Sequence, residues 1–287
     1  MAAEQARTDL VTLRAPRMWE PPTWLLIALG ALYLVALAAL IFLPNGTLID
    51  RLRALDGGIC AQAPSHSFFP AGQQLPLCAR NTGIYLGFSL GFFTLLGSGR
   101  LLSSRLPRLP VAISLLACVG LMGIDGVNSL LNDLGAPHLY HPQNPLRLIT
   151  GLGAGVAMVA FIMPVTNGLL WRWEDTRPSF KSFGQLVVVA PLLLVAFLAV
   201  SSQVAWLLYP IALVSSFGLV MALTSVNLVF LICFTPFIGR FERWKQVLPV
   251  FTLALALAMI ELTLLFKVKL ALLHAFALQL PPTLPTH

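Results

Sequence analysis

The sequence predicts an all-α protein, a polytopic helical bundle that crosses a membrane about seven times. Of the 287 residues, 57% are hydrophobic and only 10% are charged, whereas soluble domains have about 25% charged residues. Mean hydropathy is +0.84, and apolar runs of about 20 residues, the length that crosses a bilayer, recur along the whole chain. This composition excludes an ordinary soluble enzyme, a disordered chain and a small disulfide scaffold.

Seven apolar stretches have the length of membrane spans: 22–43, 83–102, 109–133, 147–171, 184–202, 204–237 and 247–266. The first is not typical of a signal peptide, because its apolar run exceeds the 7–15 residues of a signal core. The sixth has 34 residues and could bend near Pro210 or divide. Division would give eight spans and reverse the orientation of the chain that follows.

The positions of Lys and Arg predict the orientation of the bundle. They gather in the N-terminal arm and in alternate connections, 100–108, 172–181 and 240–245, and such residues mark the cytoplasmic side. The N-terminus is therefore expected in the cytoplasm and the C-terminus outside, in a prokaryotic inner (plasma) membrane. The net charge of +7 is read as a topology signal, and no nucleic-acid partner is expected.

The chain is expected to have three parts. Residues 1–22 form a cytoplasmic N-terminal arm, and residues 23–266 form the transmembrane bundle, which includes an outer loop at 44–82. In residues 267–287 the apolar positions Leu270, Leu273, Ala277 and Leu280 favour a short interfacial helix on the outside, followed by a tail.

Two cysteines, Cys60 and Cys78, share the outer loop. In an oxidising exterior compartment they would pair and close a loop of about 18 residues, worth ~3 kcal/mol on the loop-entropy account. The alternative is two free thiols. A closed zinc site is not expected, because with His66 these cysteines provide only three of the four ligands that it needs.

Polar residues near the outer surface gather on three predicted spans. Asp125, Asn128 and Ser129 follow helical spacing, so one face of the third span is polar. An intramembrane carboxylate is costly unless paired, and Asp125 is therefore expected to pair with Arg147 or Arg80. The candidate polar pocket consists of Arg80, Asn81, Tyr85, Asp125, Asn128, Asn144, Arg147 and Thr150. The alternative interpretation is an internal network that fixes helix packing.

Glycines at four-residue spacing predict close helix packing. They form strips on the second and fourth spans, where helices can approach closely: Gly83, Gly87, Gly91, Gly151 and Gly155. Asn227 and Glu261 are further buried polar candidates in the sixth and seventh spans.

No intrinsic cofactor or metal is expected. All five histidines lie in predicted loops or in the terminal segment, whereas a membrane haem needs axial ligands, usually His, within its helices. The sequence also has no phosphate-binding GxxxxGK[ST] motif, HExxH motif or Gly-x-Ser-x-Gly motif. A bound lipid or quinone remains compatible with the sequence.

The outer loop and the next two spans resemble an uncharacterised family of predicted bacterial and archaeal membrane proteins. The resemblance covers about residues 58–155 and lies in Cys60, in Leu-Pro-x-Cys-x-Arg-x-Thr-Gly-x-Tyr-x-Gly at 75–87, in Asp-Gly-x-Asn at 125–128 and in Asn-Pro-Leu-Arg at 144–147. The family has His after its first cysteine and a second Cys in Cys-x-x-Cys, where this chain has Ala61 and Asn81. The resemblance therefore implies fold and topology, while a site built from those two groups would be dismantled here.

The function expected from these observations is that of an accessory, non-catalytic integral membrane subunit in contact with lipids and with other membrane subunits. The host would be a quinol-oxidising or other electron-transfer complex, such as alternative complex III. The alternative is a transporter of small solutes or lipids that uses the outward-facing polar pocket. A membrane-embedded enzyme is the least favoured class, because no set of nucleophile and base can be named.

Overall fold

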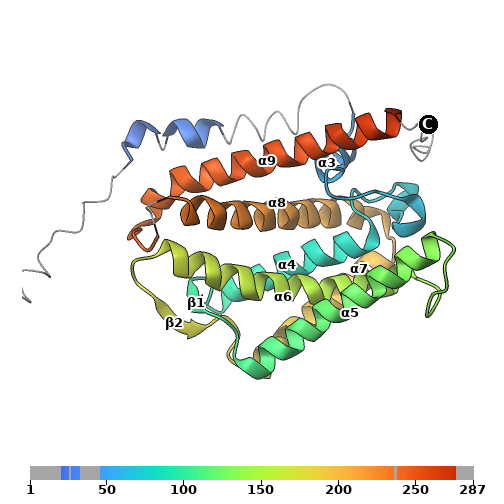
Figure 1. The fold of residues 1–287 in the computed structure, drawn as a ribbon, viewed down its shortest axis with the longest axis horizontal. Coiled ribbons are helices and arrows are strands. Elements are labelled where there is room, and N and C mark those ends of the chain that lie inside the picture. The colour runs from blue at the N-terminus through green and yellow to red at the C-terminus, as the bar shows by residue number, and fades with distance from the viewer. Residues whose placement is uncertain (1–20, 26, 33–45, 236–237, 276–287) are drawn as a thin grey trace, which may run out of the picture.

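The computed structural model describes residues 21–25, 27–32, 46–235 and 238–275, and these are almost entirely helical (Figure 1). The long helices are α4 (Ala79–Gly97), α5 (Leu109–Asp133), α6 (Asn144–Leu170), α7 (Phe183–Ser201), α8 (Leu208–Cys233) and α9 (Trp244–Ala275). Helix α3 (Leu48–Asp56), the 3₁₀ turns Pro64–His66, Pro70–Gly72 and Ala205–Leu207, and the strands β1 (Ser103–Arg105) and β2 (Asp175–Pro178) complete the labelled elements.

Five of the predicted spans are confirmed as helices that are long and apolar enough to cross a membrane: α5, α6, α7, α8 with the preceding turn, and α9. Helix α8 is undivided. The second predicted span corresponds to α4, which begins at Ala79 with a polar turn and ends at Gly97, so its apolar part is shorter than that of the five. Most of the first predicted span, residues 33–45, lies outside the described residues.

The helices lie in succession across the bundle. Figure 1 shows α9 beside α8, then α4 with α6, and α5 at the opposite edge. Helix α6 contacts α4, α5, α7 and α8, so it lies at the centre, and its apolar span is the most completely buried of the five. Its fully buried residues include Leu148 and Leu152.

Close packing of α4 on α6 depends on glycine. A Cβ atom at Gly83 would overlap the carbonyl oxygen of Leu148, and one at Gly87 would overlap that of Leu152. On α6, a Cβ atom at Gly155 would in turn overlap the carbonyl oxygen of Ile84. These helices therefore approach at backbone distance, as the glycine spacing predicts.

One end of the bundle carries a hydrogen-bonded cap, defined here as residues 46–78. Its helix α3 begins with a capping box between Thr47 and Asp50. Gln62 donates to the carbonyl oxygens of Arg53 and Pro76 at 2.8 and 2.7 Å, and Arg53 donates to that of Gln74 at 2.6 Å. These bonds fold the predicted outer loop into a compact layer.

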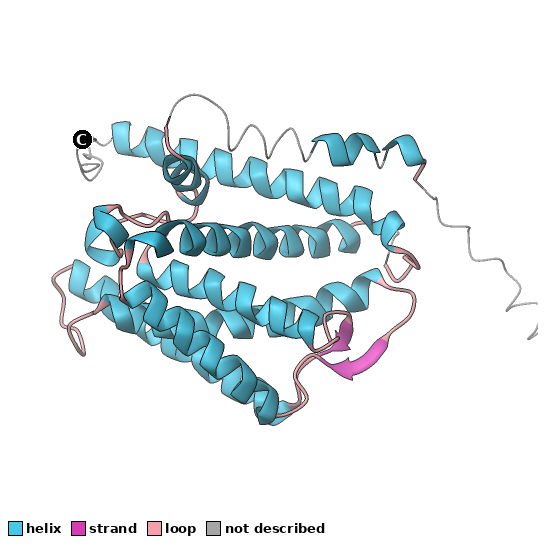
Figure 2. Ribbon diagram, turned by 180° about the vertical axis from the view of Figure 1, so that it is seen from behind, coloured by secondary structure: helices cyan, strands magenta, loops and turns pink. Residues whose placement is uncertain are grey.

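The connections at the opposite end are joined by short strands. Strand β1 pairs in parallel with β2, and an isolated bridge links Trp171 with Phe241; Figure 2 shows the strand pair at the end away from the cap. The three basic connections therefore lie at one end of the bundle, as alternate connections must. Which end faces the cytoplasm stays a prediction.

The end of the last span differs from the sequence expectation. Helix α9 continues without interruption to Ala275 instead of ending near residue 266. Residues 267–275 thus extend the seventh helix. Within this extension, Lys269 donates to cap carbonyl oxygens at Gly57, Cys60 and Ala61. The rest of the predicted interfacial segment and tail lies outside the described residues.

We expect Gly87→Ala to destabilise the protein by about 1–3 kcal/mol, because the added methyl group must displace the Leu152 backbone. The matched control is Gly120→Ala on α5, where a Cβ atom meets nothing within 4 Å. In the control the higher helix propensity of Ala leaves stability unchanged or raised. Thermal unfolding in detergent micelles would compare them, and equal stability of the two variants would contradict the packing account.

Candidate functional site

An ion pair between α4 and α5 is the centre of the predicted polar pocket. Arg80 donates from Nη2 to Asp125 Oδ2 at 2.5 Å and from Nε to the same oxygen at 3.2 Å. Arg80 Nη2 also donates to the backbone carbonyl oxygen of Asp125 at 3.1 Å. The Asp125 side chain is 1% exposed and that of Arg80 is 23% exposed, so the carboxylate is buried with its counter-charge.

Ser129 connects this ion pair to α6. Its hydroxyl oxygen accepts from Arg80 Nη2 at 3.0 Å and from Arg147 Nε at 3.3 Å. Arg147, which is also buried, donates to Asn144 Oδ1 at 2.8 Å. We call these residues, with Tyr140, the Arg80 cluster; it contains Arg80, Asp125, Ser129, Tyr140, Asn144 and Arg147.

The connection between α5 and α6 closes over the Arg80 cluster. The Tyr140 hydroxyl donates to the second carboxylate oxygen of Asp125 at 2.9 Å. Asn128 holds the same connection, because its amide accepts from the backbone N–H groups of Leu139 and Tyr140 and donates to the Tyr140 carbonyl oxygen. A ligand approaching Asp125 from this side would have to displace Tyr140.

Of the eight residues proposed for the pocket, five lie in or beside the cluster and three do not. The hydroxyl of Thr150 donates to carbonyl oxygens of its own helix. Tyr85 packs against an apolar cluster that includes Cys60 and Leu219. The backbone N–H of Asn81 interacts with the thiol of Cys78. One turn of α4 therefore serves two separate sites. Ser129 and Tyr140 complete the cluster, although neither was among the eight.

The predicted disulfide is not formed in the structure, where Cys60 and Cys78 are free thiols. The two side chains are neighbours, because the backbone N–H of Cys78 donates to Cys60 Sγ at 3.2 Å. The fold therefore brings the pair together, as the sequence expectation requires, without the covalent bond. We call Asp56, Cys60, Cys78 and Ser216 the cysteine cluster.

Asp56 is a buried carboxylate that sequence reasoning missed. It is fully buried at the end of α3, where Oδ2 accepts from the Ser216 hydroxyl at 2.7 Å and Oδ1 has no hydrogen-bond partner among the described residues. Burial raises the pKa of Asp56 from 3.8 to about 7. Two arginines precede Asp56 and two glycines follow it. This pattern is typical of an exposed loop, so the sequence does not predict that Asp56 is buried.

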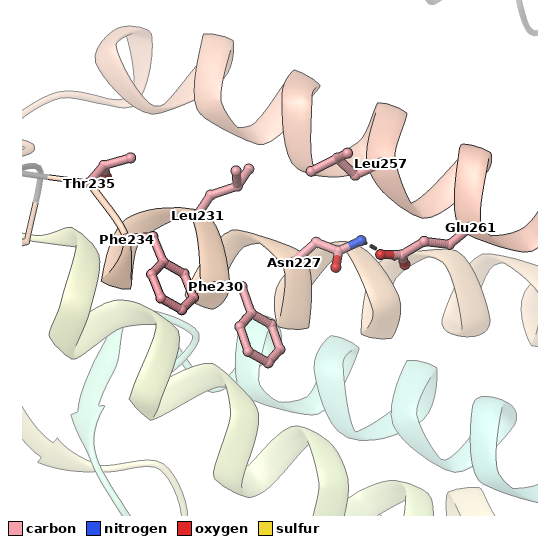
Figure 3. A pocket seen from close by; sticks show the side chains of 7 residues that line it. All are labelled: Asn227, Phe230, Leu231, Phe234, Thr235, Leu257 and Glu261. Carbon is pink, nitrogen blue, oxygen red and sulfur yellow. Dashed lines mark hydrogen bonds between the residues drawn. The ribbon is translucent and has the colours of Figure 1, made fainter.

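A third polar contact lies between α8 and α9. Asn227 donates to Glu261 Oε2 at 3.0 Å, and these side chains face each other beside an open pocket of about 340 Å³ (Figure 3). The rest of the lining is mostly apolar: Phe230, Leu231, Phe234, Thr235 and Leu257. The pairing of these two predicted polar candidates satisfies one oxygen of an intramembrane carboxylate.

No described residues form a group of three or more His, Cys, Asp or Glu side chains placed to hold a metal ion. His66, which the sequence placed near the cysteines, instead contacts Asp133 at 3.2 Å. It thereby links the cap to the end of α5.

Together, the apolar helices and the polar groups enclosed among them define a polytopic helical membrane protein. A family profile described as "Predicted membrane protein (DUF2085)" matches residues 60–161, which include both cysteines and the Arg80 cluster. The chain is 31% identical over 115 residues to Uncharacterized protein MJ1492 of Methanocaldococcus jannaschii, a match that covers 40% of this chain and 67% of that relative. The protein belongs to this family of predicted membrane proteins. No solved structure matches it.

We expect Asp125→Asn to lower the free energy of unfolding by about 3–5 kcal/mol, because it leaves the Arg80 and Arg147 guanidinium groups without their shared counter-charge. Tyr140→Phe removes a single hydrogen bond to Asp125 and should cost about 1 kcal/mol. The control is Glu174→Gln, whose side chain is exposed in the connection between α6 and α7. Thermal melts compare the stability of these variants with that of the wild type. An Asp125→Asn variant as stable as the wild type would disprove a structural role of the ion pair.

We expect the contribution of Asp56 to stability to fall as the pH rises from 4 to 8. The folded protein holds a proton on Asp56 up to about pH 7, whereas the unfolded chain loses it near pH 4, so the stabilisation is complete below pH 4 and is lost as the pH passes 7. The loss is at most about 4 kcal/mol. In melts, the stability of the wild-type protein relative to Asp56→Asn should fall between pH 5 and pH 8, because the other groups titrate alike in both proteins. The same slope in Asp56→Asn would assign the effect to another group.

Proposed function

We propose that the protein is an accessory, non-catalytic subunit of a larger membrane assembly, in which it provides scaffold and lipid contacts. The observation that carries this proposal is a contrast between the inside and the outside of the bundle. Its polar residues at the cap end bond mainly to one another, while the long apolar faces of α5 and α7 have no partner among the described residues.

The bonding within the Arg80 cluster favours a structural role. Both carboxylate oxygens of Asp125 accept hydrogen bonds, one from Arg80 and one from Tyr140. Arg147 is anchored by Ser129 and Asn144. A buried charge that is paired and fully hydrogen-bonded fixes the packing of α4, α5 and α6, and it has little capacity left for a substrate.

The apolar faces favour contact with lipids and with other membrane subunits. Fewer than a fifth of the residues in the apolar spans of α5 and α7 are buried, against about half in α6 and α8. Large side chains such as Leu116, Val127, Val187 and Val195 are more than half exposed. In a membrane complex, such faces would be covered by neighbouring helices and by bound lipid.

The test is purification of the native protein from its source membrane in mild detergent, with mass spectrometry of every polypeptide that migrates with it in stoichiometric amount. We expect other integral membrane subunits, and redox subunits among them would identify an electron-transfer complex as the host. Recovery of the protein alone, at every detergent strength that keeps it folded, would overturn the proposal.

A second candidate function is the handling of an anionic solute or lipid head group at the Arg80 cluster. It is favoured by the charge balance, since two guanidinium groups face one carboxylate. Displacement of Tyr140 would give access to Arg147. Uptake of an anionic solute, or transfer of an anionic lipid, by the protein in vesicles would support this function, and Tyr140→Ala should accelerate it.

We expect a photoreactive amino acid at Val195, on the exposed face of α7, to crosslink a stoichiometric partner subunit in native membranes. The matched control is the same amino acid at Leu139, which is also exposed but lies in the connection between α5 and α6. Crosslinks analysed by mass spectrometry would identify the neighbour. Crosslinking to lipid alone at Val195, in membranes that contain the assembly, would remove α7 from the interface.

A further inference from the structure

The cap brings together two cysteines from separate elements. Cys60 lies one turn after Asp56, and its backbone N–H donates to the Asp56 carbonyl oxygen at 3.1 Å. Cys78 is the N-cap residue of α4. The Cys60 sulfur lies 3.2 Å from the backbone nitrogen of Cys78, so the formation of a disulfide requires only a local movement of two side chains.

The two thiols have different surroundings. Cys60 is 2% exposed, and its sulfur accepts from the backbone N–H groups of Gln62 at 3.4 Å and Cys78 at 3.2 Å. Cys78 is partly exposed at the N-terminus of α4 and next to Arg80. A helix N-terminus and a neighbouring cation both favour a thiolate, so Cys78 is the reactive and accessible member of the pair.

Charge strengthens this asymmetry. The hydrogen bond from the Cys60 thiol, together with the N–H of Asn81 and the charge of Arg80, lowers the pKa of Cys78 to about 6. The pKa of Cys60 is raised by its hydrogen bond to Cys78 and by burial. The other titratable or charged groups that interact with the pair are Asp56 from α3, Tyr85 from α4, Arg147 from α6 and Lys269 from α9.

The surrounding framework holds the pair in place. Lys269 donates to the Cys60 carbonyl oxygen at 2.9 Å, which ties this part of the cap to α9. Ser216 on α8 donates to Asp56 at the end of α3. Because neither anchor uses a cysteine sulfur, the backbone on both sides of the pair stays fixed while the sulfur atoms react.

We propose that Cys60 and Cys78 form a thiol–disulfide exchange site for small, low-molecular-weight disulfides, with Cys78 as the attacking thiol and Cys60 as the resolving thiol. The partial exposure of Cys78 under the cap admits a small disulfide in preference to one in a folded protein. This proposal is independent of the role of the protein as an accessory subunit.

The exchange takes place in two balanced steps. The Cys78 thiolate attacks one sulfur of an external disulfide RS–SR, whose S–S bond breaks, so that a mixed disulfide Cys78–S–S–R forms and RS⁻ leaves. The Cys60 thiol then loses its proton and attacks the Cys78 sulfur, releasing the second RS⁻ and closing the Cys60–Cys78 disulfide. The leaving thiolates take up the protons, the cysteine pair is oxidised by two electrons, and the external disulfide is reduced to two thiols.

The decisive experiment is trapping of the first step in the full-length protein, purified in detergent and incubated with glutathione disulfide. In Cys60→Ser the second step is impossible, and we expect a stable glutathione adduct on Cys78, identified by mass spectrometry. In Cys78→Ser we expect the adduct on Cys60 to form at least about tenfold more slowly, because that thiol is buried and protonated. Both variants carry Cys118→Ser and Cys233→Ser, and their melting temperatures verify folding.

The pH profile separates an activated thiol from an ordinary one. The initial rate at which the variant that retains both cysteines consumes glutathione disulfide should change little between pH 7 and pH 9. A thiol of pKa near 8.5 would react about twentyfold more slowly at pH 7 than at pH 9. In the variant that retains both cysteines, glutathione buffers should interconvert dithiol and disulfide as a two-electron couple.

Three results would each overturn the proposal. They are failure of folded Cys60→Ser to accept glutathione, equal reactivity of the two cysteines, and a disulfide that excess dithiothreitol leaves intact. Exchange with protein disulfides but not with glutathione disulfide would overturn the proposed substrate class.

Discussion

The contact on which the rest of the structure depends is the backbone packing of α4 against α6. Glycine on both helices lets Gly83 and Gly87 approach the carbonyl oxygens of Leu148 and Leu152. In a bilayer such packing is a main attractive force between helices, because lipid chains provide no hydrophobic drive for association. The contact also sets the position of the first turn of α4, where both polar clusters meet.

This turn directs chemically different groups to opposite sides. Arg80 faces α5, where it neutralises Asp125, while Cys78 and Tyr85 face the cap and α8. The charge of Arg80 also lowers the pKa of Cys78. The ion pair and the thiol pair are therefore electrostatic neighbours, so a substitution at Arg80 would affect the packing of α5 and the reactivity of Cys78 together.

Sequence periodicity was sufficient for most of the architecture, because membrane helices depend on apolar length. The predicted range 109–133 coincides with α5, and that of 184–202 is within one residue of α7. The Arg80 cluster could be anticipated in outline from helical spacing, since Asp125, Asn128 and Ser129 share a face of α5. The sequence could not predict that Asp125 pairs with Arg80 and not with Arg147, because this choice depends on the rotation of α4 around its own axis.

The buried position of Asp56 and the short parallel strands had no signal in the sequence. Asp56 is buried because the cap folds back onto Ser216, which is 160 residues away in the chain, and residue spacing contains no information on such a contact. Strands β1 and β2 are too short to show an alternating pattern. The shared loop predicted that the two cysteines lie close together, but the predicted disulfide is not formed. The different pKa values of the two thiols depend on their mutual contact, on burial and on Arg80.

The contact of Lys269 with the cap also imposes an order on biosynthesis. The lysine follows Cys60 by 209 residues, which at 5–20 residues per second are translated in roughly 10–40 s. During this interval the first part of the protein is already made, but α9 cannot yet hold the cap. A nascent chain therefore lacks the bonds from Lys269 to the cap, and these bonds form only after the last helix is complete.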